Sequence, residues 1–334
     1  MVLQFLSSQS VVSRETGGEL GGALVGEPPN GAIPVWPVQR IFAPLLGATS
    51  AVVHETWRVD MPVMSGHCEG IVWRKAGGLL FGVIELDEAD FKASPDCSSL
   101  QAASAEAYRR IFRLLDTEQV PHLWRVWNYL AEINLDTQGL ERYRQFNIGR
   151  QDAFLEFHRG ATGNVPAACA IGLVGGPLSI AFMAGETPAA PVENPRQVSA
   201  YNYPADYGPR SPTFSRAALA YLPDQELLFI SGTASIVGHQ TVHPGDAVGQ
   251  CREAMANIEA VLAESKRQCR SQPFELGELS YRVYVRQAGD FPAIRETLAL
   301  LIGQAEIVYV QADICRQDLL LEIEAMASHT LGNR

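Results

Sequence analysis

Two glutamates near the carboxyl end of the chain have the spacing and surroundings of a catalytic acid. Glu322 and Glu324 follow the apolar run Leu319–Leu321. In a strand, residues two apart point to the same face, about 6.5–7 Å from one another. Burial and like charge would raise the pKa of at least one carboxyl group, as a general acid requires near neutral pH. We assign this role to Glu322; a solvated strand face carrying both glutamates is the alternative.

A cysteine lies seven residues before this acid. Lone cysteines are more often small buried hydrophobes than reactive thiols. Cys315 has no histidine as a sequence neighbour. The residues alone therefore assign it no catalytic triad.

Arginines and tyrosines elsewhere could hold an anionic ligand, because a guanidinium group binds a carboxylate through two parallel hydrogen bonds. Tyr143, Asn147 and Arg150 recur at i, i+4 and i+7 and share one helical face. That face could instead be solvated, with Tyr143 at the edge of the core. Arg216 is a second candidate, or else a surface salt bridge of little energy. The phenol of Tyr203 is a candidate hydrogen-bond donor, or else an aromatic ring packed over a linker.

The elements that must position these residues repeat along the chain. The second half contains, in order, a strand, a helix that Asp246 caps, a strand, a helix that begins near Asp290, and two strands. These segments are Leu227–Gly232, 247–262, Tyr281–Val285, 291–302, Ile307–Gln311 and Leu319–Ala325. The first half repeats the order with Leu79–Leu86, 100–114, Trp124–Trp127, 140–155, Ala167–Leu173 and Leu178–Ala184. In each unit an opening hairpin precedes these elements. Their order predicts an α+β fold, with helices on one face of a mixed sheet.

Composition narrows the range of functions. The chain has 334 residues, enough for two domains, and a formal net charge of −11 without a basic block, which argues against nucleic-acid binding. No apolar run reaches the roughly 20 residues of a membrane span, and the amino-terminal stretch lacks the features of a signal peptide. Six cysteines without a C-x-x-C pair favour a reduced, cytoplasmic protein. His239 and His243 precede Pro244, which predicts a loop and no metal site.

The second unit resembles the RidA/YjgF family over about 115 residues. The resemblance rests on Ser215–Gly232, Gln250–Leu262, Arg282–Phe291 and Glu322–Ala327. Stand-alone members are enamine or imine deaminases with an arginine early in the penultimate strand. Here that position falls near Ile307, where the sequence has no arginine, which argues against simple imine deamination.

The chain from about residue 35 to its end is more similar to the chorismatases, in which a degenerate RidA-like unit precedes a recognisable one. The shared motifs are Arg142–Phe146, Gly149–Arg150, Tyr201–Pro204, Gly208–Arg210, Phe214–Arg216 and Cys315–Glu324. The resemblance implies two tandem RidA/YjgF-like (chorismate mutase-like) units. Residues 1–187 would form the degenerate unit, 188–212 a Pro- and Tyr-rich linker or lid, and 213–334 the unit with the acid.

Family members with cysteine seven residues before the catalytic glutamate resemble 3-hydroxybenzoate synthases, and some also yield 4-hydroxybenzoate. Members with alanine there resemble hydrolases that make a dihydroxycyclohexadienoate. Cys315 therefore implies a cysteine-type lyase that converts chorismate into 3-hydroxybenzoate and pyruvate without a cofactor. Glu322 would protonate the enolpyruvyl group, and Cys315 would direct the outcome. Four residues would bind the substrate: Tyr143, Arg150, Tyr203 and Arg216.

Two other classes of function stay open on the residues alone. One is a RidA-like enamine or imine deaminase, and the other is a non-catalytic binder of an aromatic metabolite. Stand-alone RidA units form trimers, whereas a fused pair can satisfy part of that packing internally. We therefore expect a monomer or a homotrimer, with the site in the cleft between the two units.

Overall fold

Three main β-sheets form the framework of the computed structural model, which describes residues 1–12, 14–27 and 33–332. The first sheet has four strands in the order β1-β4-β2-β3. Its strands are β1 (Leu3–Ser8), β2 (Glu19–Gly26), β3 (Val38–Ile41) and β4 (Val52–Val59). No strand is predicted from the sequence for residues 3–59, so this sheet is a difference from expectation.

The second sheet has six strands in the order β11-β8-β12-β7-β6-β5. Its strands are β5 (Met64–Cys68), β6 (Ile71–Ala76), β7 (Leu79–Leu86), β8 (His122–Ala131), β11 (Ala167–Leu173) and β12 (Leu178–Gly185). Helices α1 (Ser99–Thr117) and α2 (Arg142–Glu156) accompany it. The Ser98 hydroxyl accepts a hydrogen bond of 3.1 Å from the amide of Gln101 and so caps α1. The buried stripe of α1 is the predicted one, from Leu100 to Leu114.

The third sheet has the order β13-β14-β15-β20-β18-β19. Its strands are β13 (Ala190–Val192), β14 (Ala217–Leu222), β15 (Gln225–Thr233), β18 (Ser280–Val285), β19 (Ile307–Gln311) and β20 (Leu321–Thr330). Helices α3 (Ala247–Ser265) and α4 (Phe291–Ile302) belong to it. Asp246 caps α3 as predicted, through a 2.9 Å bond from the amide of Gly249. Asp290 precedes α4, but its side chain makes no capping hydrogen bond.

The two six-stranded sheets have the same topology, which confirms the repeat. Read from its other edge, the third sheet runs β19-β18-β20-β15-β14-β13 and matches β11-β8-β12-β7-β6-β5 strand for strand. In both sheets the first two strands of this order are parallel and the others antiparallel. The fold is therefore α+β, with two tandem units of mixed sheet and two helices each. Four short strands form two further hairpins: β9 (Asp136–Thr137), β10 (Leu140–Glu141), β16 (Ile236–Val237) and β17 (Gln240–Thr241).

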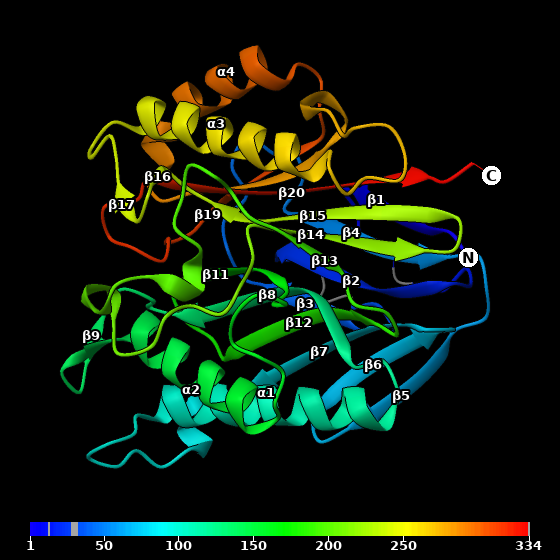
Figure 1. The fold of residues 1–334 in the computed structure, drawn as a ribbon, viewed down its shortest axis with the longest axis horizontal. Coiled ribbons are helices and arrows are strands. Elements are labelled where there is room, and N and C mark those ends of the chain that lie inside the picture. The colour runs from blue at the N-terminus through cyan, green and yellow to red at the C-terminus, as the bar shows by residue number, and fades with distance from the viewer. Residues whose placement is uncertain (13, 28–32, 333–334) are drawn as a thin grey trace.

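The sheets lie between two helical layers (Figure 1). Helices α3 and α4 cover one outer side, α1 and α2 cover the other, and the amino-terminal strands lie between the two units. A shared core joins the three sheets, with Trp57, Phe81 and Phe229 each supplied by a different one. The rings of Trp57 and Phe229 lie 5.8 Å apart. The two units are therefore fixed to one another through buried aromatic contacts.

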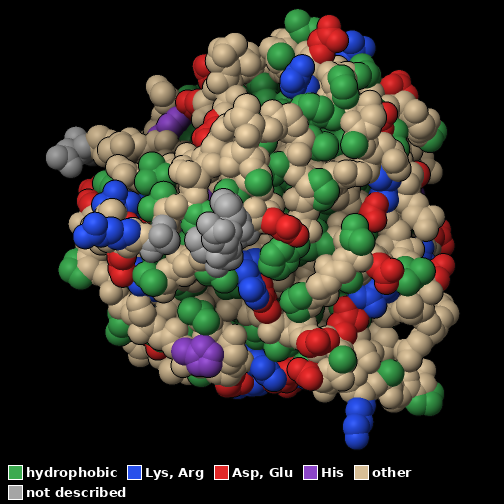
Figure 2. All heavy atoms as spheres, turned by 180° about the vertical axis from the view of Figure 1, so that it is seen from behind, with side chains coloured by type: hydrophobic (Ala, Val, Ile, Leu, Met, Phe, Trp, Pro, Cys, Tyr) green, Lys and Arg blue, Asp and Glu red, His purple; other side chains and the backbone are tan. Residues whose placement is uncertain are grey.

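The surface carries both signs of charge. On the face that Figure 2 shows, basic and acidic side chains are interspersed with apolar ones. None of the described helices is long and apolar enough to cross a membrane.

Candidate active site

A cavity of about 560 Å³ opens between the two units beside the start of β20. This volume lies in the range of small-molecule sites. The first unit lines it with the β9–β10 hairpin and the start of α2, and the second unit lines it with the end of β15 and the loop before β20. Five of the six residues that the sequence predicts for the site line this cavity: Glu322, Cys315, Tyr143, Tyr203 and Arg216.

Glu322 is a buried carboxyl group on the wall of this cavity. The residue is 4% exposed and has no salt bridge within the described part of the chain. Burial raises the pKa of Glu322 to about 8, and the negative charge of Glu324 adds to the rise. The positive charges of Arg125 and Arg216 oppose the rise without cancelling it. The carboxyl group therefore keeps its proton near neutral pH, as the spacing of the two glutamates predicts.

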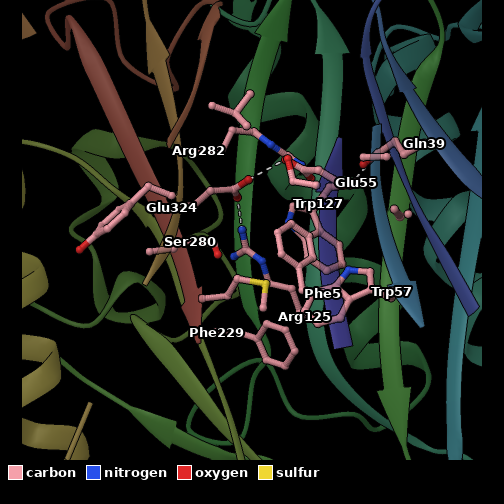
Figure 3. A pocket seen from close by; sticks show the side chains of 18 of the residues that line it. Phe5, Gln39, Glu55, Trp57, Arg125, Trp127, Phe229, Ser280, Arg282 and Glu324 are labelled. Atoms are coloured by element: carbon pink, nitrogen blue, oxygen red, sulfur yellow. Dashed lines mark hydrogen bonds and ion pairs between the residues drawn. The ribbon is translucent and has the colours of Figure 1, made fainter. Parts of the chain in front are cut away.

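Glu324 has a different environment, which Figure 3 shows. It forms ion pairs with Arg125 on β8 and with Arg282 on β18, the latter at 3.0 Å. The hydroxyl of Tyr284 also donates to it, at 2.9 Å. Arg282 in turn pairs with Glu55 on β4. One residue of the pair is thus tied into a charge cluster that joins all three sheets, whereas Glu322 is left free to exchange its proton.

Cys315 lies next to the acid. Its Sγ is 3.9 Å from Oε2 of Glu322, within reach of a weak S–H hydrogen bond. Burial and then the charge of Glu322 raise the pKa of the thiol. Cys315 is therefore a neutral, partly buried thiol. The positive charges of Arg316 and Arg286 oppose this rise without cancelling it, so these surroundings do not produce a nucleophilic thiolate.

Arg216 and Tyr203 form a second wall of the cavity. Nη2 of Arg216 donates to the hydroxyl of Tyr203 at 2.9 Å and to the carbonyl of Val198 at 2.7 Å. Nε of Arg216 is buried and has no hydrogen-bond partner among the described residues. The segment 188–212 therefore does more than connect the units, because it holds the guanidinium group of Arg216 in place.

Tyr143 and Arg150 share one face of α2, but the structure places them differently. Tyr143 lines the cavity, whereas Arg150 is 1% exposed and does not. Nη2 of Arg150 donates to Oδ1 of Asn147 at 2.8 Å, and its guanidinium group lies over the ring of Phe146. Burial raises the pKa of Tyr143, and the positive charge of Arg150 partly offsets this rise. Arg150 therefore does not contact the cavity although its charge affects Tyr143, and this face is largely buried rather than solvated.

Comparison with known proteins identifies the family. The family model "Chorismatase FkbO/Hyg5-like, N-terminal" matches residues 55–184. A Streptomyces hygroscopicus protein named chorismatase is 38% identical over 280 residues, which cover 82% of this chain and 79% of that protein. This chain belongs to the chorismatase family. A second protein of that organism, named 3-hydroxybenzoate synthase, is 36% identical over 298 residues, which cover 84% of this chain and 83% of that protein. A chorismatase crystal structure, 32% identical, superposes with a TM-score of 0.85 and covers 98% of each chain.

The chorismatase cavity also contains an arginine that the sequence reasoning did not select. Nη1 of Arg316 donates to the carbonyl of His239 at 2.9 Å, and its guanidinium group lies 4.2 Å from the ring centre of Tyr207 and 5.3 Å from that of Tyr203. Nη2 of Arg316 is buried and unpartnered within the described residues. The available signal was its position directly after Cys315, inside a family motif. Glu141, on the opposite wall, was missed as well.

This chorismatase site combines a neutral carboxylic acid with two guanidinium groups, each of which has an unused buried nitrogen. Such an arrangement can hold an anion with more than one carboxylate and donate a proton to it. Within the described residues no three His, Cys, Asp or Glu side chains gather as metal ligands. His239 instead contacts the hydroxyl of Tyr207, with its Nδ1 at 3.2 Å.

Proposed function

We propose that this chain converts chorismate into 3-hydroxybenzoate and pyruvate by protonating the enolpyruvyl group. The observation that carries the proposal is the buried Glu322, whose pKa burial raises to about 8, on the wall of a cavity that also contains two incompletely paired arginines. The relative named 3-hydroxybenzoate synthase supports this choice of product. Some 4-hydroxybenzoate is a compatible side product, because both isomers form by the same loss of pyruvate.

The two carboxylates of chorismate match the two arginines. Arg216 and Arg316 approach the ring of Tyr203 at 5.7 and 5.3 Å, so one tyrosine positions both cations. We assign one carboxylate to each guanidinium group. The hydroxyl of Tyr143 is a further donor on the opposite wall, and Arg150 adds positive charge from behind the lining.

Catalysis begins with transfer of the proton of Glu322 to the methylene carbon of the enolpyruvyl group. The ether bond to the ring then breaks, its electron pair becomes part of the carbonyl group of pyruvate, and the neighbouring ring hydroxyl attacks the vacated carbon. The resulting epoxide opens, and loss of a ring proton gives the aromatic product. The two products together contain the atoms of chorismate, so the reaction consumes no water and needs no cofactor.

Cys315 directs the outcome in this proposal. Its sulfur lies 3.9 Å from Oε2 of the acid, and we place it where a water molecule would otherwise approach the ring. A thiol is larger and more polarizable than the methyl group of alanine. We infer that it excludes or reorients this water, so that the epoxide collapses to the aromatic product rather than being hydrolysed.

The proposed units are residues 1–187 and 213–334, joined by 188–212, with the acid in the second and Tyr143 in the first. One chain therefore supplies a whole cavity, and we expect a monomer, with a homotrimer as the alternative. Sedimentation of the purified protein separates the two states. The six cysteines are free, which fits our expectation of a cytoplasmic enzyme.

The test is incubation of the purified chain with chorismate, followed by chromatography and an enzymatic assay for pyruvate. We expect pyruvate and 3-hydroxybenzoate in equal amounts, and Glu322→Gln should lower kcat by about 10²–10⁴-fold. Glu296→Gln, on an exposed face of α4, is the matched control and should keep full activity. Binding of chorismate without turnover, or release of ammonia from an imine substrate, would refute the proposal.

A further inference from the structure

Another carboxyl group, that of Glu141, lines the active-site cavity and comes from the unit that does not contain β20. Glu141 ends β10 and directly precedes α2, and its side chain is 19% exposed. A glutamate at this position could cap the helix, but its side chain makes no capping hydrogen bond. Its contacts are long, at 3.3 Å to Nδ2 of Asn134 and 3.3 Å to Nε of Arg144. Much of its hydrogen-bonding capacity is therefore available to a ligand.

The surroundings of Glu141 tune its basicity. Burial raises the pKa of this carboxyl group and the charge of Asp136 adds a little, whereas Asn134 and Arg144 act in the opposite direction. Glu141 also affects Cys315, whose pKa is raised by burial, by the charge of Glu322 and, more weakly, by the charge of Glu141. The negative charges of Glu322 and Glu141 thus both act on this thiol. Because its own pKa is raised, Glu141 is a stronger base than an exposed glutamate, and it lines the same cavity as the acid from the other unit.

We propose that Glu141 is the general base of the reaction and accepts the proton of the ring hydroxyl as that hydroxyl attacks. This role rests on the proposed function, because it needs a substrate whose hydroxyl displaces an enolpyruvyl ether. When Glu322 has protonated the methylene carbon and the ether bond breaks, the hydroxyl oxygen forms its new bond to the ring carbon. Its proton passes to the carboxylate of Glu141. After the epoxide opens, the ring proton lost on aromatisation restores Glu322, and Glu141 releases its proton to solvent as the oxygen regains one.

The two carboxyl groups, of Glu322 and Glu141, then act in opposite protonation states. The active enzyme has Glu322 protonated and Glu141 ionised. Activity therefore falls at high pH, when Glu322 loses its proton, and falls at low pH, when Glu141 gains one. If Glu141 only formed an ion pair with Arg144, its protonation would not make kcat fall at low pH.

The experiment is a comparison of Glu141→Gln with Glu88→Gln. Glu88 pairs with Arg142 at the start of the same helix but does not line the cavity, so its substitution reproduces the loss of an ion pair there. We expect Glu141→Gln to lower kcat by about 10²–10³-fold with little change in KM, and to remove the acidic limb of the kcat profile. Glu141→Asp should restore part of kcat. Glu88→Gln should lower Tm only and keep the wild-type pH profile.

The inference is overturned if folded Glu141→Gln keeps kcat within a few-fold of the wild type, or if its acidic limb is unchanged. If the glutamine variant does not fold, Glu141→Asp decides: a displaced acidic limb supports the base, and an unmoved limb overturns it. Failure of the proposed function itself would look different, because the wild-type chain would then release no pyruvate from chorismate.

Discussion

Replacing Glu324 by glutamine should make Glu322 lose its proton at a lower pH. The two side chains share one face of β20, about 6.5–7 Å apart at the usual strand rise. At an effective dielectric constant of about 20, two unit charges at that distance repel by about 2.5 kcal/mol. This energy corresponds to somewhat less than about 2 pKa units. Because Arg125, which already lowers the pKa of Glu322, would remain, we expect a fall of about 1–2 units from about 8.

The assay is kcat for pyruvate release as a function of pH. The wild type should lose activity on the alkaline side around pH 8, and Glu324→Gln should lose it about 1–2 units earlier. Glu55→Gln is the matched control, because it removes another carboxylate from Arg282 but is not among the groups that shift Glu322. Each variant leaves a buried arginine with an incomplete set of partners, which typically costs about 3–5 kcal/mol, so Tm should fall in both. A folded Glu324→Gln enzyme whose alkaline limb stays at the wild-type position would refute the reasoning.

Glu322 also makes stability depend on pH: its pKa is raised from 4.5 to about 8 on folding, so its contribution is complete below about pH 4.5 and falls as the pH rises through 8. The resulting loss of unfolding free energy is at most about 5 kcal/mol. Urea titrations at several pH values should show that the free energy of unfolding depends less steeply on pH in Glu322→Gln than in the wild type; equal slopes would contradict the assignment. Cys315→Ala should shift the products towards a dihydroxycyclohexadienoate while pyruvate release continues, and an unchanged product ratio by chromatography would exclude the directing role. Arg316→Gln should raise KM about 30–150-fold, since a hydrogen bond to a charged group contributes about 2–3 kcal/mol; the same change at the exposed Arg267 should leave KM unaltered.

Much of the fold could be predicted because many of its helices and strands have residue patterns that identify them in the sequence. The apolar stripe of α1 and the aspartate before α3 mark these helices in the sequence as clearly as in the structure. Strand β2 carries no such signal, because all of its residues are buried and its glycines interrupt any alternation. A side chain at Gly21 would meet the ring of Phe81, a residue of another sheet. Only the assembled structure shows why glycine is needed there.

The sequence predicts those parts of the site that depend on residues close to one another along the chain. The spacing of Glu322 and Glu324 predicts a raised pKa, but not which of the two has it. That choice depends on Arg125, which lies 199 residues away from Glu324 in the sequence. Arg316 was missed for the same reason, because the ring of Tyr207 that positions it comes from a distant segment. Side chains that act through partners remote in sequence leave no pattern within a single stretch.

Strand β20 is an inner strand of its sheet, between β15 and β18. A nascent chain that has not yet reached residue 321 would have a gap in the middle of this sheet, and Arg125 in the other unit would lack its carboxylate. The sheet of the second unit, and the ion pair that it shares with the first, can therefore form completely only after β20 has left the ribosome, which lengthens the period in which chaperones can bind the chain. Glu322 belongs to this strand, so the segment that completes the sheet also brings its carboxyl group to the cavity.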